Sequence, residues 1–184
     1  YKRQVISRAH LPAPFTVQGG GSDLRFPHHE FSAAHATAVD GLPLAHTYAH
    51  TGMVALDGEK MSKSLGNLEL VSRLRARGVE PVAVRAAILA HHYRSDWEWS
   101  EQVLADAQAG VARWRAALDG PHAAAGVAVL DAVHAALSDD LDAPRALEAL
   151  DAWAAGTLPG LAEAAADPLP VVDVVAALLG LRLR

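Results

Sequence analysis

The sequence contains no cysteine, and only three of its 184 residues are lysines. Without cysteine, the chain cannot form a disulfide or a zinc site built from its own thiolates. It also lacks any uninterrupted run of 18 apolar residues, and its start, YKRQVISRAHLPAPF, has no apolar core of a secretory signal. Hydrophobic residues nevertheless make up 51% of the chain, which is enough for a folded core. We therefore expect a globular cytoplasmic protein without a membrane span.

Basic residues are scarce in the second part of the chain. Residues 1–80 contain nine Lys or Arg and seven Asp or Glu, whereas residues 81–184 contain seven and fourteen. Binding of nucleic acid normally requires a basic surface that releases counterions from phosphates. The acidic C-terminal part is therefore a poor candidate for RNA binding.

Hydrophobic periodicity changes near residue 80 and predicts two domains. Before this point, short apolar runs at 15–18 and 48–56 alternate with helix-like stretches at 27–39 and 68–77. After it, Pro81 suits the first turn of a helix, apolar residues recur at helical spacing over 103–118, and further helices are expected at about 123–137, 143–155 and 170–182. The alanine-rich tracts at 123–125 and 162–166 favour helix. We predict an α/β fold over 1–80 followed by an all-α helical bundle over 81–184.

Two of the three lysines, Lys60 and Lys63, stand in the segment DGEKMSKSLGN at 57–67. On a loop that follows a strand, two ammonium groups and neighbouring N–H donors can bind a polyanion, and a triphosphate is the obvious ligand. For an arbitrary loop with two lysines, a solvated basic turn is the alternative interpretation.

The string KMSKS resembles, residue for residue, the lysine-rich loop of class I aminoacyl-tRNA synthetases. Further segments are similar in order and spacing to the cysteinyl-tRNA synthetase group: QGGGSDLRFPHHE (18–30), HTGMVALDGEKMSKSLGN (50–67), AHHYRSDWEWSE (90–101) and DDLDAPRAL (139–147). The similarity runs from Phe15 to the end, and we expect residues 1–14 to lie outside it. It implies the C-terminal part of a class I synthetase Rossmann-like catalytic domain, followed by a helical bundle.

This group contains two kinds of enzyme. Cysteinyl-tRNA synthetases charge tRNA with cysteine, whereas mycothiol ligases join cysteine to the amine of glucosaminyl-inositol in mycothiol biosynthesis. In the synthetases the histidine pair continues as ENE, with a zinc-binding second Glu, but here EFS places Ser32 there. The chain also ends at Arg184 directly after an acidic bundle, with no extension for an anticodon-binding domain. These features favour the ligase, with cysteine, ATP and glucosaminyl-inositol as substrates and no tRNA. A cysteinyl-tRNA synthetase fragment and a non-catalytic relic or binding module are the alternatives.

The resemblance implies catalytic roles for Lys60 and Lys63. They match the loop lysines that hold the β- and γ-phosphates of ATP and stabilise the charge that develops as pyrophosphate leaves. Met61, Ser62 and Ser64 belong to the same nucleotide-binding loop.

The resemblance also implies a nucleoside site. Gly19, Gly20 and Gly21 let the backbone approach the nucleotide, and Gly21, Ser22 and Asp23 match the adenylate-binding segment, with the Asp23 carboxylate suited to ribose hydroxyls. The stretch Met53–Val54 matches the one whose backbone meets adenine. Without the resemblance, the glycines indicate a tight turn and Met53–Val54 a buried strand end.

Zinc is the expected metal, and His28 matches its histidine ligand. Taken alone, His28 is typical of a helix-terminal or core histidine. The chemical reason for zinc is that the thiolate of a cysteine substrate is a soft ligand that zinc binds strongly, whereas the hydroxyl of serine competes poorly. His29 receives no role.

Two parts of the family pattern are missing. The resemblance requires an N-terminal nucleotide-binding half with a HIGH-type motif and a zinc-binding cysteine, and a second cysteine about 25 residues before His28, near Arg3. Neither part is present. We therefore expect the chain alone to be inactive and to bind zinc weakly at most. An incomplete α/β sheet leaves an unpaired edge, so we predict self-association of the chain, whereas the full-length enzyme is expected to be monomeric. We interpret Trp97, Trp99 and Trp114 as packing the bundle against the α/β part.

Overall fold

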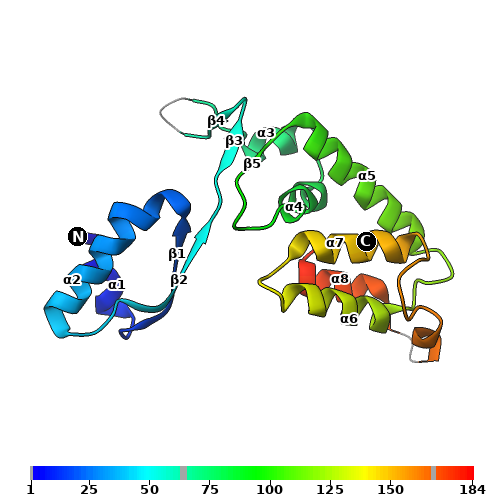
Figure 1. The fold of residues 1–184 in the computed structure, drawn as a ribbon. Coiled ribbons are helices and arrows are strands. Elements are labelled where there is room, and N and C mark those ends of the chain that lie inside the picture. The colour runs from blue at the N-terminus through cyan, green and yellow to red at the C-terminus, as the bar shows by residue number, and fades with distance from the viewer. Residues whose placement is uncertain (1, 63–65, 167–168) are drawn as a thin grey trace. The chain divides into compact units, whose positions relative to one another are not determined.

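The computed structural model describes residues 2–62, 66–166 and 169–184, and the chain folds into two compact units (Figure 1). The N-terminal unit contains the chain up to Val54 together with Arg94–Trp97. The C-terminal unit contains Ala55–Tyr93 and the chain from Glu98 onward. The domain boundary that the sequence predicts at residue 80, between an α/β and an all-α domain, stays a prediction.

A βαβ arrangement forms the N-terminal unit. Strands β1 (Phe15–Gly21) and β2 (Ala45–Thr51) pair in parallel, and helix α2 (Glu30–Asp40) connects them. Parallel neighbours need such a crossover connection. The register pairs Phe15 with Ala45 and Gly21 with Thr51, so both strands end at the same edge. Helix α1 (Lys2–His10) precedes β1, and two short turns lead into α2: the 3-10 helix η1 (Ser22–Leu24) and the π-helical η2 (Arg25–His29).

The strand predicted at 15–18 and the helix predicted at 27–39 are confirmed, with shifted ends. Strand β1 continues through the glycines to Gly21, and α2 starts only at Glu30. Helix α2 stops before Gly41, whose φ of 72° is a left-handed conformation that glycine adopts without steric cost. Helix α1 was not predicted.

The apolar run predicted as one strand over 48–56 forms two strands. Strand β2 ends at Thr51, and β3 (Val54–Leu56) belongs to a sheet of order β4-β3-β5, with β4 at Glu59–Lys60 and β5 at Trp97–Glu98. Between β3 and β4, Asp57 and Gly58 have φ values of 55° and 76°, as a two-residue hairpin turn of type I′ requires. Strand β5 was not predicted, since two residues are too short for a periodic pattern.

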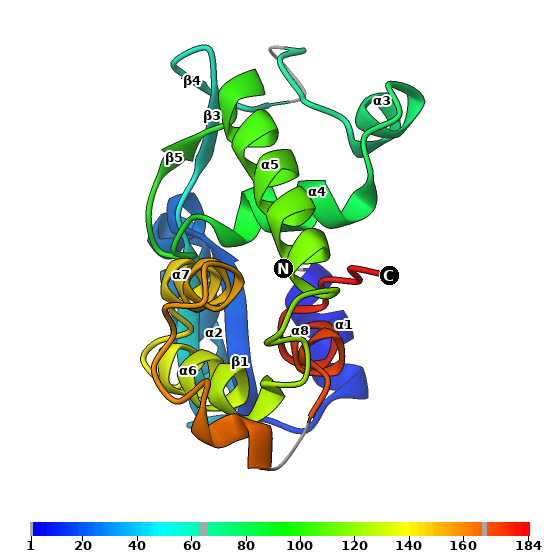
Figure 2. The same ribbon diagram turned by 90° about the vertical axis from the view of Figure 1, so that its right-hand side faces the viewer.

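Consecutive helices make up most of the C-terminal unit (Figures 1 and 2): α3 (Val71–Ala76), α4 (Pro81–Leu89), α5 (Glu101–Ala117), α6 (Gly126–Leu137), α7 (Ala143–Ala154) and α8 (Val171–Leu179). Pro81 occupies the first turn of α4, as predicted. Ser100 caps α5 by accepting the Val103 N–H at 3.2 Å, and Asp142 caps α7 by accepting the Arg145 N–H at 3.1 Å. Among the described residues, no helix is both long and apolar enough to cross a bilayer.

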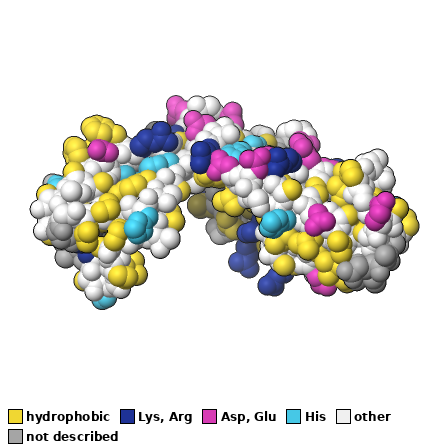
Figure 3. Space-filling view, turned by 60° about the horizontal axis from the view of Figure 1, so that its bottom comes forward, with side chains coloured by type: hydrophobic (Ala, Val, Ile, Leu, Met, Phe, Trp, Pro, Cys, Tyr) yellow, Lys and Arg dark blue, Asp and Glu magenta, His cyan; other side chains and the backbone are white. Residues whose placement is uncertain are grey.

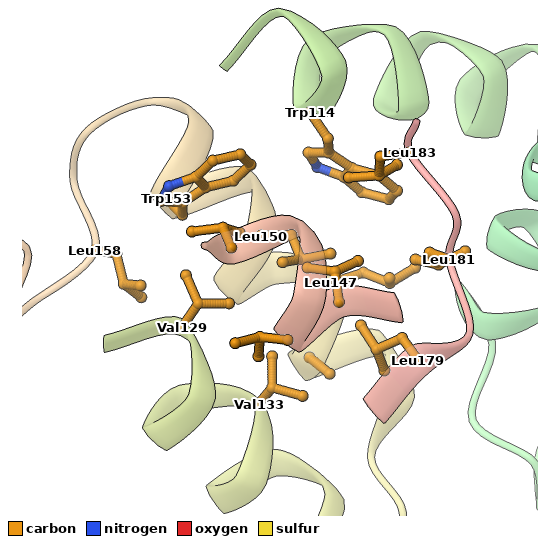
Figure 4. Packing of buried hydrophobic residues seen from close by; sticks show 14 of the residues in the cluster. Trp114, Val129, Val133, Leu147, Leu150, Trp153, Leu158, Leu179, Leu181 and Leu183 are labelled. Carbon is orange, nitrogen blue, oxygen red and sulfur yellow. The ribbon is translucent and has the colours of Figure 1, made fainter. Parts of the chain in front are cut away.

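The core of the bundle is built from apolar residues of α4 to α8 (Figure 4). Leu150, Val129 and Val133 are completely buried, and two tryptophans are nearly so. Trp114 donates its indole N–H to Asp151 Oδ1 at 2.8 Å, and Trp153 donates to the His122 carbonyl at 2.9 Å. Because these donors are satisfied inside the bundle, the rings can be buried at no polar cost. Trp114 is thus a core residue of the bundle itself, and its interpretation as a contact with the α/β part is wrong.

The end of the chain is extended and not helical. The helix predicted over 170–182 stops at Leu179, because Gly180 adopts a φ of 64°. Leu181 and Leu183 are still buried, at 0% and 2% exposure, and Arg115 Nε donates to the Leu183 carbonyl at 3.0 Å. Of the alanine tracts expected to favour helix, 162–166 contributes to the 3-10 helix η3 (Glu163–Ala166), whereas 123–125 is not helical: it forms a turn and a single β-bridge from Ala125 to Leu169 before α6.

Candidate active site

Three glycines form the last residues of β1, at the edge where both parallel strands end. None of them has a positive φ, so the tight-turn interpretation is wrong. A Cβ on Gly20 would lie 2.7 Å from His29 Cε1, and one on Gly21 would lie 2.6 Å from Asp23 Oδ1. A Cβ on Gly19 would meet nothing within 4 Å. A methyl group on Gly20 or Gly21 would therefore force the His29 or the Asp23 side chain to move.

Residues predicted to bind the nucleoside lie around Gly21. The Asp23 carboxylate, in η1 with Ser22, points back at Gly21, and the sulfur of Met53 lies 3.5 Å from the position of a Cβ there. Met53 stands between β2 and β3, and Val54 opens β3. A carboxylate and a thioether beside a bare backbone can accept ribose hydroxyls and contact a base. Ligands of parallel sheets bind at this carboxyl edge of the strands.

A second cluster at the same edge was missed by the sequence analysis. His29 is 7% exposed, and its Nδ1 lies 2.8 Å from Nε2 of His50 on β2. Gln18 Nε2 lies 3.4 Å from His29 Nε2, and the His29 and Tyr48 rings are 6.4 Å apart. Burial, and then the neighbouring His50 and His28, lower the pKa of His29 below its usual value. The spacing of Tyr48 and His50, two residues apart on a predicted strand, was the available signal, since such residues share one face.

The expected metal ligand is next to this cluster in sequence. His28 is exposed in η2, and its carbonyl accepts the Ser32 hydroxyl at 2.7 Å. Among the described residues, no three His, Cys, Asp or Glu side chains are grouped so that they hold a metal ion. The residues that the structure describes therefore do not, by themselves, fit a zinc site.

The lysine loop begins on the β3–β4 hairpin of the C-terminal unit. Lys60, exposed, is the last residue of β4 and pairs in register with Ala55. Met61 and Ser62 follow and are half-buried. Lys63 and Ser64 lie outside the described residues.

Asn67 holds the backbone of this loop and was not among the predicted site residues. Its Oδ1 accepts the Ser62 N–H at 2.8 Å, and its Nδ2 donates to the Lys60 carbonyl at 3.2 Å. One amide side chain therefore fixes two backbone groups beside a predicted catalytic lysine.

Comparison with known families matches residues 3–109 to the tRNA synthetases class I (C) catalytic domain. A curated relative from Micrococcus luteus, named L-cysteine:1D-myo-inositol 2-amino-2-deoxy-alpha-D-glucopyranoside ligase, is 97% identical over 180 residues, which are 98% of this chain and 43% of the relative. Relatives of the same name from Cellulomonas flavigena and Streptomyces coelicolor are 58% and 54% identical, over 97% and 90% of this chain and 44% and 43% of their own lengths. The chain thus spans less than half the length of these relatives.

A solved structure shares the fold. The LeuRS–tRNA–LeuAMS ternary complex of Agrobacterium radiobacter K84 matches with a TM-score of 0.57 and 19% identity, over 93% of this chain and 26% of that chain. This likeness and the family match confirm the predicted fold class. The family match starts at residue 3, so the expectation that residues 1–14 lie outside the resemblance is wrong. Those residues carry none of the motifs on which the resemblance was based.

Proposed function

Because the chain belongs to the family of the tRNA synthetases class I (C) catalytic domain, we propose that it is part of an ATP-dependent ligase, which activates cysteine as cysteinyl-adenylate and transfers it to glucosaminyl-inositol. The observation that carries the proposal is the 97% identity to a relative with this ligase name. ATP use, mycothiol biosynthesis and a cytoplasmic location are parts of the same proposal.

In the activation step, the carboxylate of cysteine attacks the α-phosphorus of ATP, and the bond to pyrophosphate breaks. Negative charge grows on the leaving pyrophosphate, and Lys60 and Lys63 are proposed to stabilise it. A fixed cation placed where charge develops typically lowers the barrier by a few kcal/mol, about 3 kcal/mol for one group. The hydrogen bonds of Asn67 to Lys60 and Ser62 support this role, since they hold the loop backbone before ATP binds.

The nucleoside of ATP is proposed to bind at the end of β1. Gly19, Gly20 and Gly21 form this strand end: the backbone is open at Gly19, whereas His29 and Asp23 lie against Gly20 and Gly21. Ser22 and Asp23 are proposed to face the ribose. Both main-chain polar groups of Met53 are already hydrogen-bonded, its N–H to Asp96 Oδ1 and its C=O to the Trp97 N–H. The Met53 N–H is therefore already in use, and the adenine contact is proposed to involve the Met53 thioether and Val54. Met61, Ser62 and Ser64 complete the proposed nucleotide-binding set.

In the transfer step, the amine of glucosaminyl-inositol attacks the carbonyl carbon of the mixed anhydride, AMP leaves, and an amide forms. The acidic bundle supports a small acceptor over tRNA, because it offers few cations to a phosphate backbone. Ser32 supports it as well. This position has no carboxylate for a metal because it is a serine, and the serine hydroxyl donates a hydrogen bond to the His28 carbonyl.

Zinc belongs to the proposal only for the longer protein. His28 is exposed and is the one ligand that this chain would contribute. The other ligands would come from the part of the relatives' length that the chain does not span. When bound, zinc would hold the thiolate of cysteine and reject serine.

The N-terminal unit exposes apolar side chains that a complete α/β domain would cover. Val39 and Phe26 are 78% and 70% exposed, and apolar side chains are open to solvent on the face that Figure 3 shows. Val17 and Thr47 pair in register on one face of the sheet, and both are exposed. Parallel sheets are normally covered on both faces. We propose that the rest of the longer protein covers this surface in a monomeric enzyme, and that the chain alone self-associates through it.

The test supplies labelled cysteine and ATP to the chain, with and without the remaining part of the Micrococcus luteus relative. Glucosaminyl-inositol and tRNA compete as acceptors, and the product is identified by mass. Amide formed only with the added part supports the proposal. Charged tRNA would assign the chain to the synthetases, and absence of any product would leave a relic or a binding module.

A further inference from the structure

A short segment around β5 holds the stretch that is proposed to contact adenine. The Asp96 carboxylate accepts the Met53 N–H at 2.7 Å, and the Trp97 N–H donates to the Met53 carbonyl at 3.0 Å. The Trp99 N–H donates to the Ala55 carbonyl at 2.9 Å. Hydrogen bonds to Met53 and to Ala55, on either side of Val54, thus fix the path of the backbone through this stretch.

The contact is close enough to require a glycine. An ideal Cβ on Gly52 would lie 2.0 Å from the Ser95 carbonyl oxygen and 2.7 Å from the Asp96 nitrogen. Gly52 has no positive φ, so the requirement comes from this close approach and not from its own backbone conformation. The Ser95–Asp96 backbone therefore lies directly against the turn between β2 and β3.

The position of Met53 depends on this contact. Its sulfur lies beside Gly21, where the Asp23 carboxylate also points. The Asp96 bond is the one side-chain bond described for the Met53 backbone, and an ionised acceptor makes it a strong one. A shift of the Met53 backbone by an ångström would move the thioether away from Gly21.

We infer that Asp96 is a positioning residue for ATP: its carboxylate holds the Met53 N–H so that the Met53 side chain faces the nucleoside site beside Gly21. The inference rests on the proposed function, because it uses the assignment of Met53 to the adenine contact. The role is specific to the nucleotide, so binding of cysteine should not depend on Asp96.

The experiment uses a full-length chimera, in which this sequence replaces its counterpart in the Micrococcus luteus relative. Asp96→Ala, Asp96→Asn and the wild type are compared by ATP–pyrophosphate exchange with cysteine, and the Kd of ATP is measured by calorimetry. We expect Asp96→Ala to raise the KM and Kd for ATP about tenfold, with kcat changed less than threefold and the KM for cysteine unchanged. Asp96→Asn keeps an acceptor oxygen and should restore most of the ATP affinity.

Asp131→Ala, an exposed aspartate on α6, is the matched control and should behave as wild type. If the wild-type chimera formed no adenylate, the proposed function would fail before the role of Asp96 was reached. If the wild type were active and Asp96→Ala kept its ATP affinity, the inference would be wrong, because Asp96 would then have no effect on ATP binding. A higher ATP affinity would also overturn it, because Asp96 would then compete with adenine for the Met53 N–H. An equal loss of affinity in Asp96→Asn, or an equal rise in the KM for cysteine, would also overturn it.

Discussion

Gly52→Ala should destabilise the N-terminal unit more than a Gly→Ala substitution at any other glycine of that unit. A Cβ at this position would lie 2.0 Å from the Ser95 oxygen, whereas an ordinary contact needs about 3.4 Å, so the backbones must separate by more than one ångström. Both contacting groups are backbone and cannot rotate away. Overpacking costs about 1–3 kcal/mol, and we expect about 3 kcal/mol here, which lowers the ratio of folded to unfolded protein roughly a hundredfold.

The matched control is Gly19→Ala, the same substitution on strand β1, where a Cβ meets nothing within 4 Å. Urea unfolding of the two variants gives the difference in free energy, and amide hydrogen exchange locates it. Exchange should accelerate at the Met53 and Trp97 amides in Gly52→Ala, because these N–H groups bond across the contact. Equal stability and equal exchange in both variants would refute the steric argument.

Three further perturbations test the lysine loop, the bundle core and an ion pair. Lys60→Ala in the full-length chimera should slow adenylate formation about a hundredfold in pyrophosphate exchange, with an unchanged melting temperature, and a wild-type rate would contradict its role. Leu150→Ala empties a completely buried position and should cost about 2–5 kcal/mol in urea unfolding, so a loss below about 1 kcal/mol would contradict the core assignment. Arg115, through its hydrogen bonds at 2.9 and 2.7 Å, lowers the pKa of Glu80 below the usual 4.5. The ionised carboxylate is thus favoured in the folded state, and its stabilisation is present above pH 4.5 and lost as the pH falls through the lower folded-state pKa. Glu80→Gln should flatten the loss of stability in this acid range, and identical pH profiles would argue against the pair.

The sequence predicted most of the bundle because its signals are local. Pro81, the helical spacing of apolar residues over 103–118 and the breaks between helices all act within a few residues. The end of the chain was mispredicted because burial there has a tertiary cause. Leu181 and Leu183 alternate with arginines in an extended segment, and the core that they fill is built by residues far away in sequence.

The sequence could predict the candidate site only at motif positions, where a residue acts through its own side chain or, for glycine, through having none. The resemblance marked Lys60 and Met53, but not Asn67 and Asp96, whose side chains bond to their backbones. Asp96 and Met53 are 43 positions apart, and no periodicity or local composition connects them. Asn67 stands inside the recognised loop segment, yet its two bonds to the loop backbone depend on the path of the chain and not on its residue type.

The two adjacent histidines show how the structure separates residues that the sequence treats alike. Gln18 Nε2 lies 3.4 Å from Nε2 of His29, and His29 Nδ1 lies 2.8 Å from His50 Nε2. All three side chains are satisfied when the Gln18 amide donates to His29 Nε2 and the Nδ1–H of His29 donates to His50. The lowered pKa of His29 agrees with this neutral form, because burial and then the neighbouring His50 and His28 disfavour the charged ring. Both nitrogens of His29 are then engaged, whereas His28 is exposed. Of the pair, His28 is thus the one whose ring is open to solvent, as the proposed zinc site of a longer protein requires.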